Sequence, residues 1–197
     1  MPLGAFRTAL MGIAGAGGDN VKLLDTQDAT SDVTSIEFTS KINATYKEYV
    51  WVWYDVNPTT DGAHFEFQMD AAGGAYGYDD LNMVSCYGRI YLSGNTSGGF
   101  NHLDTHAQGG TANYARLTNS NGNAATESSA GELHVINPSN TSLETIWWAN
   151  TSTIDVDTRP DAGRPGGHFM ANTAMNAIKF KMSSGSFTGK IKMWGYN

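Results

Sequence analysis

Alternation of apolar and polar residues with a period of two is the feature that most constrains the fold of this chain. In Ala63–Met69 (AHFEFQM) every second side chain is large and apolar. Ala177–Met182 (AIKFKM) and Gly189–Trp194 (GKIKMW) repeat the pattern. No segment offers three helical turns of good helix formers with an apolar period of 3.6. Half-buried antiparallel strands produce this alternation, so the chain is predicted to fold from strands.

The strongest strand signal is Glu48–Val56 (EYVWVWYDV), which consists almost wholly of aromatic and β-branched residues and is followed by Asn57-Pro58. Both faces of this segment are bulky, which predicts a central strand covered on both sides. Asp61-Gly62 marks a turn before the next strand. Four further strands are predicted at Val33–Thr39, Tyr87–Leu92, Gly131–Ile136 and Leu143–Asn150.

The last two alternating segments are predicted to form a closing hairpin. Only a short polar connection around Ser183–Ser186 separates them. The apolar side chains of both segments are predicted to face the core, and these are Ile178, Phe180, Ile191 and Met193. The lysines that alternate with them are predicted to face solvent.

Composition agrees with strands rather than helices. Charged residues make up only 16% of the 197 residues, and glycine occurs 23 times, which favours turns and strands. Roughly eight strands without helices imply a sandwich or a closed barrel. We therefore predict an all-β fold, an antiparallel two-layer β-sandwich that is jelly-roll-like. It is predicted to form one domain at residues 19–197, after a short N-terminal arm at residues 1–18.

Charge and cysteine content argue against several classes of protein and site. The net charge is −7, and the twelve Lys and Arg residues are scattered, so no nucleic acid is expected as a partner. The single cysteine, Cys86, excludes an intrachain disulfide and a Cys-based zinc site, and it is expected to serve packing. No run of about 18 apolar residues occurs, so no membrane insertion is predicted.

Residues 1–18 (MPLGAFRTALMGIAGAGG) differ from the remainder because they contain no acidic residue. The spacing of Phe6, Leu10 and Ile13 is roughly helical, and together with Met11 they form an apolar set that cannot bury itself. We interpret this segment as a docking arm that becomes ordered against a neighbouring subunit. A frayed terminus is one alternative. A secretory signal is another, although the segment lacks a basic start.

Three long connections are predicted between strands, at Asp70–Asn82, Ser93–Thr126 and Ser152–Gly167. Loops of this length are usually functional or become ordered against a partner. The first contains Tyr76 and Tyr78, which are expected to be exposed and to contact a glycan or a neighbouring subunit. The second is expected to lie at the same rim of the sandwich or at a contact between subunits.

Candidate metal ligands are few. His102, Asp104 and His106 would point the same way in an extended segment and could meet one ion. The spacing alone fixes no coordination, so solvated loop side chains or contacts between subunits are the preferred interpretation. Asp55-x-Asn57 and Asp155-x-Asp157 resemble fragments of calcium loops, but calcium takes six to eight oxygens. Aspartates in strand connections are more often turn residues.

Catalytic signatures are absent from the sequence. It contains no GxSxG nucleophile elbow and no phosphate-binding GxxxxGK[ST] loop. None of its nineteen acidic residues stands in a recognisable glycosidase signature. We therefore predict that the protein is not an enzyme and that it has no catalytic residues, no cofactor and no metal ion.

The five tryptophans admit two interpretations. Exposed rings could stack on sugars, as in carbohydrate-binding sandwiches. Four of the five stand inside predicted strands among apolar neighbours, where large aromatic side chains more often belong to the core or to a subunit interface. The second interpretation is preferred for Trp51, Trp53, Trp147, Trp148 and Trp194.

Three segments resemble a known group of proteins. They are Ser35–Gln68 (SIEFTSKINATYKEYVWVWYDVNPTTDGAHFEFQ), Ser129–Ser142 (SAGELHVINPSNTS) and Asn172–Gly195 (NTAMNAIKFKMSSGSFTGKIKMWG). In this order they resemble virion proteins encoded by tailed phages, especially phages of marine bacteria and cyanobacteria. The resemblance covers about 70 residues, and its motifs are framework strands rather than catalytic motifs.

The resemblance implies a structural protein of the virion, from the tail, the fibre or the capsid exterior. Its implied partners are further copies of itself, as a trimer, and other virion proteins. A carbohydrate-binding module that contacts glycans on the host cell surface is the alternative function. A secreted glycan hydrolase is a third hypothesis, which the lack of catalytic signatures disfavours.

Overall fold

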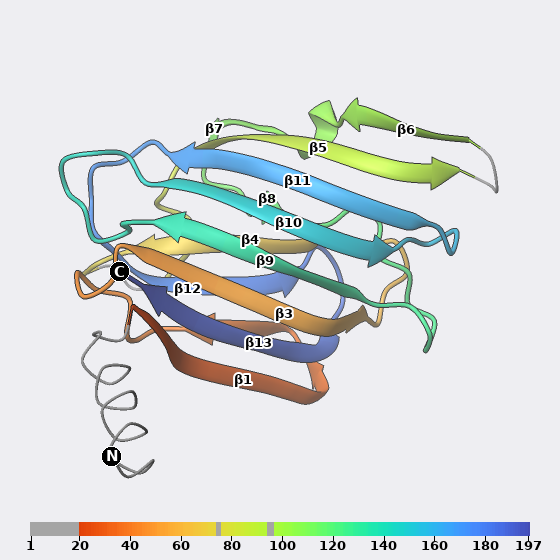
Figure 1. The fold of residues 1–197 in the computed structure, drawn as a ribbon, viewed down its shortest axis with the longest axis horizontal. Helices are drawn as coiled ribbons and strands as arrows, with labels where there is room; N and C mark the ends of the chain where they lie inside the picture. Colours follow the sequence, from red (N-terminus) through yellow and green to blue (C-terminus); the bar gives the residue numbers. More distant parts are fainter. Residues whose placement is uncertain (1–19, 74–75, 94–96) are drawn as a thin grey trace, which may run out of the picture.

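The protein is a sandwich of two antiparallel sheets, as predicted (Figure 1). Its computed structural model describes residues 20–73, 76–93 and 97–197. The larger sheet has the order β1 (Val21–Val33), β13 (Phe187–Tyr196), β3 (Glu48–Pro58), β9 (Ser129–Ile136), β10 (Ile146–Ile154), β11 (Pro160–Phe169), β5 (Met83–Ser93) and β6 (Ser97–His102), with β7 (Gln108–Thr111) paired to β5. The smaller sheet has the order β2 (Ser35–Phe38), β12 (Met175–Met182), β4 (Phe65–Ala71) and β8 (Ala115–Arg116).

Helical structure is minimal. One three-residue 3-10 helix, Asp104–His106, interrupts the strands of the described chain. No helix in that part of the chain is long and apolar enough to cross a membrane. The predicted arm at residues 1–18, with Phe6, Leu10, Met11 and Ile13, lies outside the described residues.

The predicted closing hairpin is wrong, because β12 and β13 belong to different sheets. β12 pairs with β2 and β4 in the smaller sheet, whereas β13 pairs with β1 and β3 in the larger one. The short turn around Gly185 (φ 74°) therefore carries the chain from one layer to the other. The predicted orientation is confirmed, because both strands point their apolar residues inward, and Ile178, Phe180, Ile191 and Met193 are all fully buried.

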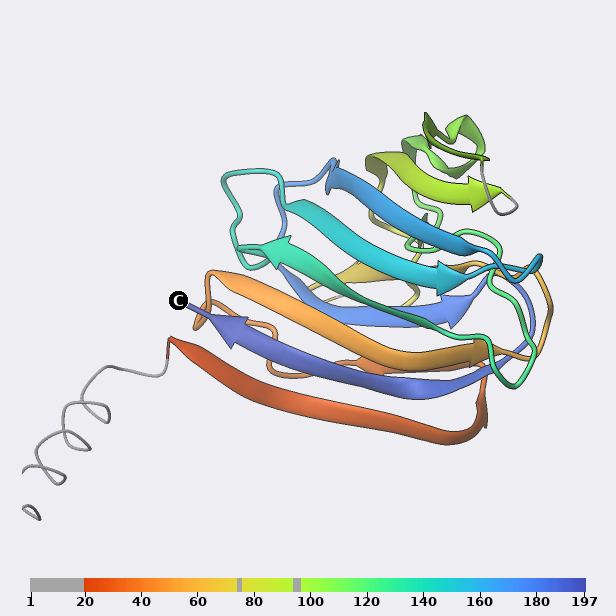
Figure 2. The same ribbon diagram turned by 45° about the vertical axis from the view of Figure 1, so that its right-hand side comes forward.

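Aromatic rings from both sheets meet around Phe180 in the core. The Phe180 ring lies 5.7 Å from Phe65 and 6.4 Å from Phe67, measured between centroids. On the other side it lies 6.3 Å from both Phe38 and Trp51. Figure 2 shows the smaller sheet behind the larger one, and these rings fill the space between them. Close-packed rings of this kind contribute much of the burial energy of a sandwich.

The prediction that β3 is a central strand is confirmed. The prediction that it is covered on both sides is wrong. It lies between β13 and β9. Its inward residues Tyr49, Trp51 and Trp53 are fully buried. On the outer face Val50 is buried by its neighbours in the sheet, whereas Tyr54 is 40% exposed. The outer aromatic residue therefore belongs to a surface that faces solvent.

The predicted connection at Ser152–Gly167 is mostly strand, because β10 continues to Ile154 and β11 begins at Pro160. Strand β11 is rich in glycine, which lowers strand propensity. Close neighbours explain two of its three glycines. A Cβ on Gly163 would overlap Thr151 Oγ1, and one on Gly167 would overlap the Val84 carbonyl oxygen.

Strand β1 was not predicted, and its pattern explains why. It is an edge strand that pairs only with β13, and most of its residues are exposed or half-buried. Polar residues at an edge hide the alternation that marks central strands. Likewise the predicted connection Ser93–Thr126 contains β6, β7, β8 and the 3-10 helix.

Candidate functional site

A groove crosses the outer face of the larger sheet, and we call it the outer groove. Its floor is a row of small side chains. Ser152 on β10 pairs with Ala130 on β9 and with Ala162 on β11. A hollow of about 490 Å³ lies over this row. Because residues directly opposite in neighbouring strands face the same side, the three small residues leave a continuous trough across the strands.

A row of polar side chains borders the outer groove. Asn150 pairs with Glu132 in the sheet, and its Nδ2 donates a hydrogen bond of 2.9 Å to Glu132 Oε1. The guanidinium of Arg164 donates to Asn150 Oδ1. Beyond Glu132, His134 Nε2 lies 3.6 Å from Glu132 Oε2, and the His134 ring stacks on Trp148 with centroids 4.6 Å apart. These contacts hold the row in a fixed arrangement.

The groove continues in both directions. On one side its wall is Tyr54, which also lines a hollow of about 640 Å³ over β1, β13 and β3. On the other side Ser152 and Ala162 also line an apolar hollow of about 450 Å³, together with Ile90 and Leu92. The three hollows share lining residues, so the groove runs across the sheet from β1 toward β6.

A separate hollow, of about 600 Å³, lies over the outer face of the smaller sheet. Its charged residues largely neutralise one another. Glu66 Oε1 lies 3.5 Å from Arg116 Nε, and Glu66 Oε2 lies 3.4 Å from Lys181 Nζ. Burial raises the pKa of Glu66, and the two cations oppose that shift. With its polar groups already paired, this hollow is a weaker candidate than the outer groove.

Tyr76 and Tyr78, predicted as an exposed pair, are separated by the structure. Tyr76 is 42% exposed, whereas Tyr78 is only 1% exposed. The Tyr78 hydroxyl donates to Glu37 Oε2 at 3.2 Å, and Lys179 Nζ lies 5.0 Å from the ring centroid. Burial raises the pKa of Tyr78, and the nearby Glu37 carboxylate adds to the effect. The exposure expected for Tyr78 is therefore wrong, because its ring packs on the smaller sheet.

His102, Asp104 and His106 do not converge on one point. His102 Nδ1 and Asp104 Oδ1 lie 2.7 Å apart at the surface. The 3-10 turn instead buries His106, whose ring lies 4.8 Å from His64. Among residues 20–73, 76–93 and 97–197, no group of three His, Cys, Asp or Glu side chains is arranged to hold a metal ion.

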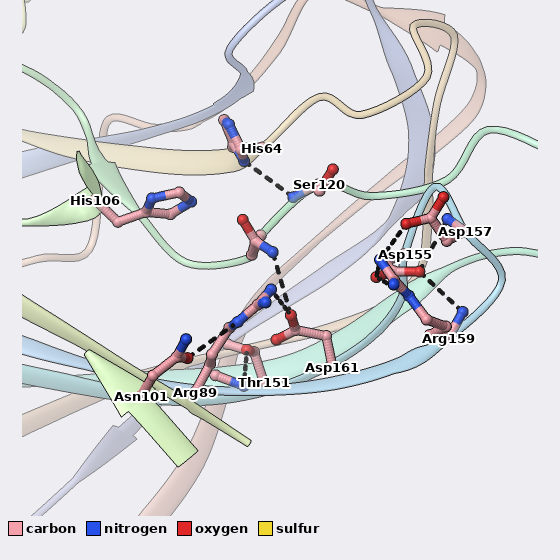
Figure 3. A network of polar contacts seen from close by, with 12 residues as sticks. His64, Arg89, Asn101, His106, Ser120, Thr151, Asp155, Asp157, Arg159 and Asp161 are labelled. Atoms are coloured by element: carbon pink, nitrogen blue, oxygen red, sulfur yellow. Dashed lines mark hydrogen bonds and ion pairs between the residues drawn. The ribbon is translucent and has the colours of Figure 1, made fainter. Parts of the chain in front are cut away.

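Side chains of the two calcium-like fragments form hydrogen bonds with backbone groups of nearby turns. Asp155 Oδ1 accepts hydrogen bonds from the amides of Asp157 and Arg159, and the Arg159 side chain pairs with both aspartates (Figure 3). At the other fragment, Asn57 Nδ2 donates to the carbonyl oxygen of Ala124 at 3.0 Å. The interpretation as turn residues is confirmed for Asp155 and Asp157, whereas it is wrong for Asp55 and Asn57, which lie within β3.

A histidine pair lies in a half-buried polar cluster beside β8, at the edge of the smaller sheet (Figure 3). The amide of Ser120 donates to His64 Nδ1 at 3.0 Å, and Arg116 Nη1 lies 3.2 Å from His106 Nδ1. Each Nδ1 is therefore placed to accept a hydrogen bond, which requires an imidazole without a proton on that nitrogen. Burial, followed by the charge of Arg116, lowers the pKa of both His64 and His106 to about 4.

This pair predicts loss of stability in mild acid. The folded pKa lies below the unfolded value of about 6.5, so the unfolded chain binds protons more readily and stability falls as the pH drops from about 6.5 toward 4. Glu66 and Asp161 oppose this trend, because burial raises their pKa. The contribution of His64 is therefore isolated by His64→Asn, which keeps an acceptor for Ser120.

When the pH is lowered from 7 to 5, the unfolding free energy of both proteins is expected to fall. The fall should be smaller for His64→Asn than for the unmodified protein, by on the order of 1–2 kcal/mol. Urea denaturation at the two pH values measures the difference. Between pH 7 and pH 8 both proteins should change equally, which is the control. Equal losses between pH 7 and pH 5 would contradict the prediction.

The tryptophans divide between core and surface. Trp51, Trp53 and Trp147 are buried, as the preferred interpretation predicts. Trp148 points outward and is 39% exposed, because it follows the inward-facing Trp147 in the same strand. Cys86, which was expected to serve packing, is also exposed on the outer face. Its thiol lies 3.6 Å from the carbonyl oxygen of Gly166.

The outer groove has no signal in the sequence pattern. Ala130, Ser152 and Ala162 are small residues at outward positions of three strands, and only the register of those strands shows that they are neighbours. Comparison of the chain with protein-family models, with curated proteins and with solved structures finds no match.

Proposed function

We propose that this protein is a non-enzymatic structural component of a tailed-phage particle. It acts there through homo-oligomerisation, as a trimer, and through docking on other virion proteins of the tail, the fibre or the capsid exterior. The proposal rests on the resemblance of three segments to phage virion proteins. One structural observation supports it most, namely how those three segments lie in the fold.

The three resembling segments lie far apart in the sequence but side by side in space. They supply β13, β3 and β9, which are consecutive in the larger sheet, and β2, β12 and β4, which are consecutive in the smaller sheet. The two sets pack on each other through Trp51, Phe38 and Phe180. The resemblance therefore concerns one continuous framework, which supports a shared structural role rather than chance similarity of scattered strands.

The end of the sandwich where β1 begins is rich in exposed apolar side chains, and we call it the arm end. Figure 1 shows that the start of β1, the start of β10 and the end of β11 lie at this end. Leu143 is 68% exposed and Ile146 58% exposed, and Met170 is 50% exposed. Val21 and Leu23 are also exposed, on the start of β1, which lies four strands away from β10 in the same sheet. Neighbouring exposed apolar residues on β10 and in its flanking loops are typical of protein interfaces.

Deleting residues 2–18 tests the docking role of the arm. The described sandwich buries its core with residues between Ala29 and Met193, so the truncated protein is expected to keep its far-ultraviolet circular dichroism. Its mass by light scattering is expected to fall from a trimer to a monomer, because closed assembly needs the complementary apolar surfaces. A truncated protein that still forms the same oligomer would contradict the role of the arm.

Two surface variants sharpen the test. Ile146→Ser at the arm end is expected to weaken oligomerisation. Phe100→Ser, at a more exposed side chain on strand β6, is the matched control and should leave oligomerisation unchanged. The virion location is tested separately, by labelling purified phage particles with antibodies against the protein. Failure to label intact or disrupted particles would overturn it.

A further inference from the structure

The outer groove combines a small-residue floor, a fixed polar row and an exposed aromatic wall. We propose that it binds an uncharged glycan chain, laid across the strands of the larger sheet. This function goes beyond the proposed structural role and does not depend on it.

The groove is long enough for an oligosaccharide. Its three hollows, of about 640, 490 and 450 Å³, are joined by shared lining residues, which are Tyr54 at one junction and Ser152 with Ala162 at the other. From β3 to β5 it crosses four strand spacings, which is about 19 Å. A linear ligand of several units suits this shape better than a compact small molecule.

The polar row offers planar groups that suit sugar hydroxyls. Asn150 is held between Glu132 and Arg164 by hydrogen bonds, so all three groups keep their orientation without a ligand. Each retains unused capacity, because a carboxylate accepts about four hydrogen bonds and a guanidinium donates five. Neighbouring hydroxyls of a sugar both donate and accept, and this row provides both partners. Preorganised groups reduce the entropy lost on binding.

Tyr54 supplies an apolar face for stacking. Its ring is 40% exposed beside the floor, and Lys192 Nζ lies 5.5 Å from the ring centroid. The carbon-bound hydrogens of a sugar ring present an apolar face that packs on such a ring. The small side chains of Ala130, Ser152 and Ala162 allow a ligand to approach the sheet closely.

A glycan suits this surface better than a peptide. The backbone groups of β9, β10 and β11 are engaged within the sheet, so an extended peptide would find no unpaired strand edge on this face. Charge favours an uncharged ligand. Lys190 is neutralised by Asp28, with Nζ and Oδ2 2.7 Å apart. The protein carries a net charge of −7, which repels polyanions.

Binding can be tested with the full chain on immobilised oligosaccharides. The probes are neutral glucans, galactans, mannans and xylans, with alginate and polygalacturonate as the acidic arm. We expect binding to at least one neutral probe. Ser152→Tyr, which fills the groove without removing a polar contact, is expected to weaken that binding by about tenfold or more. Thr26→Tyr is the matched control, because Thr26 is an exposed residue of β1 that lines none of these hollows.

A second pair of variants tests the stacking. Tyr54→Ala is expected to lose about tenfold in affinity, whereas Tyr54→Phe keeps most of it. The proposal is overturned if no neutral probe binds, if only the acidic probes bind, or if Ser152→Tyr binds as well as Thr26→Tyr. These readouts use glycan binding alone, so they are distinguishable from a failure of oligomerisation or of particle labelling.

Discussion

Replacing Phe180 with alanine is expected to lower the free energy of unfolding by about 3–5 kcal/mol. Phe180 is fully buried and lies between Phe38 and Trp51 on one side and Phe65 and Phe67 on the other. The rings come from both sheets, so the cavity left by the substitution cannot close without moving one sheet against the other. Urea denaturation followed by tryptophan fluorescence measures the change.

Lys179 provides the matched control, because it precedes Phe180 in β12 and points to the opposite face. Its ammonium lies 2.9 Å from Glu37 Oε1 near the surface. Lys179→Ala is therefore expected to cost about 1 kcal/mol or less. Similar losses for the two variants would show that β12 does not bury Phe180 and that its register is wrong.

Removing the carboxylate of Asp161 is expected to have an effect of similar size. Asp161 is 2% exposed, and its Oδ2 lies 2.7 Å from Arg89 Nη1 and accepts a hydrogen bond from Asn119 at 3.2 Å (Figure 3). Asp161→Leu leaves the mostly buried guanidinium without its partner, which typically costs about 3–5 kcal/mol. Thermal and urea denaturation measure the loss.

A double-mutant cycle separates the ion pair from the cost of a buried charge. Arg89→Leu alone leaves the Asp161 carboxylate, whose pKa is raised by burial, without its cation. The double variant Arg89→Leu, Asp161→Leu is expected to lose less unfolding free energy than the sum of the two single losses, by at least about 1.5 kcal/mol. Strictly additive losses would show that the two side chains do not interact.

The alternation of apolar and polar residues correctly predicted the strands that turn one apolar face to the core. In β12 the outward side chains are half-buried, whereas in β4 they are polar but buried under loops, as Gln68 is by its hydrogen bonds to Leu81 and Ala112. The same signal fails in β1, whose edge position leaves most of its side chains exposed, and in β11. In β11 the glycines make room for Thr151 and for the backbone of β5, so a packing requirement looks like a loop signal.

Pairing between strands could not be predicted from alternation. Ala177–Met182 and Gly189–Trp194 are separated by a short turn, which favours a hairpin when read locally. The strands β2 and β4 occupy both edges of β12, and β1 and β3 occupy both edges of β13. These long-range pairings decide the topology. The floor of the outer groove comes from β9, β10 and β11, which are consecutive in the sequence, and there the register of the pairing, rather than its range, brings the small residues together.

The placement of β12 and β13 has a consequence for protein synthesis. In each sheet the strand made last is inserted between strands made first, with β12 between β2 and β4 and β13 between β1 and β3. While the ribosome still holds the C-terminal segment, β1 and β3 have no shared partner, and the aromatic segment Glu48–Val56 lacks one of its neighbours. Such unpaired strands are prone to aggregate. Neither sheet can close before β12 and β13 have been made, so the strands that precede them wait for their central partners during synthesis.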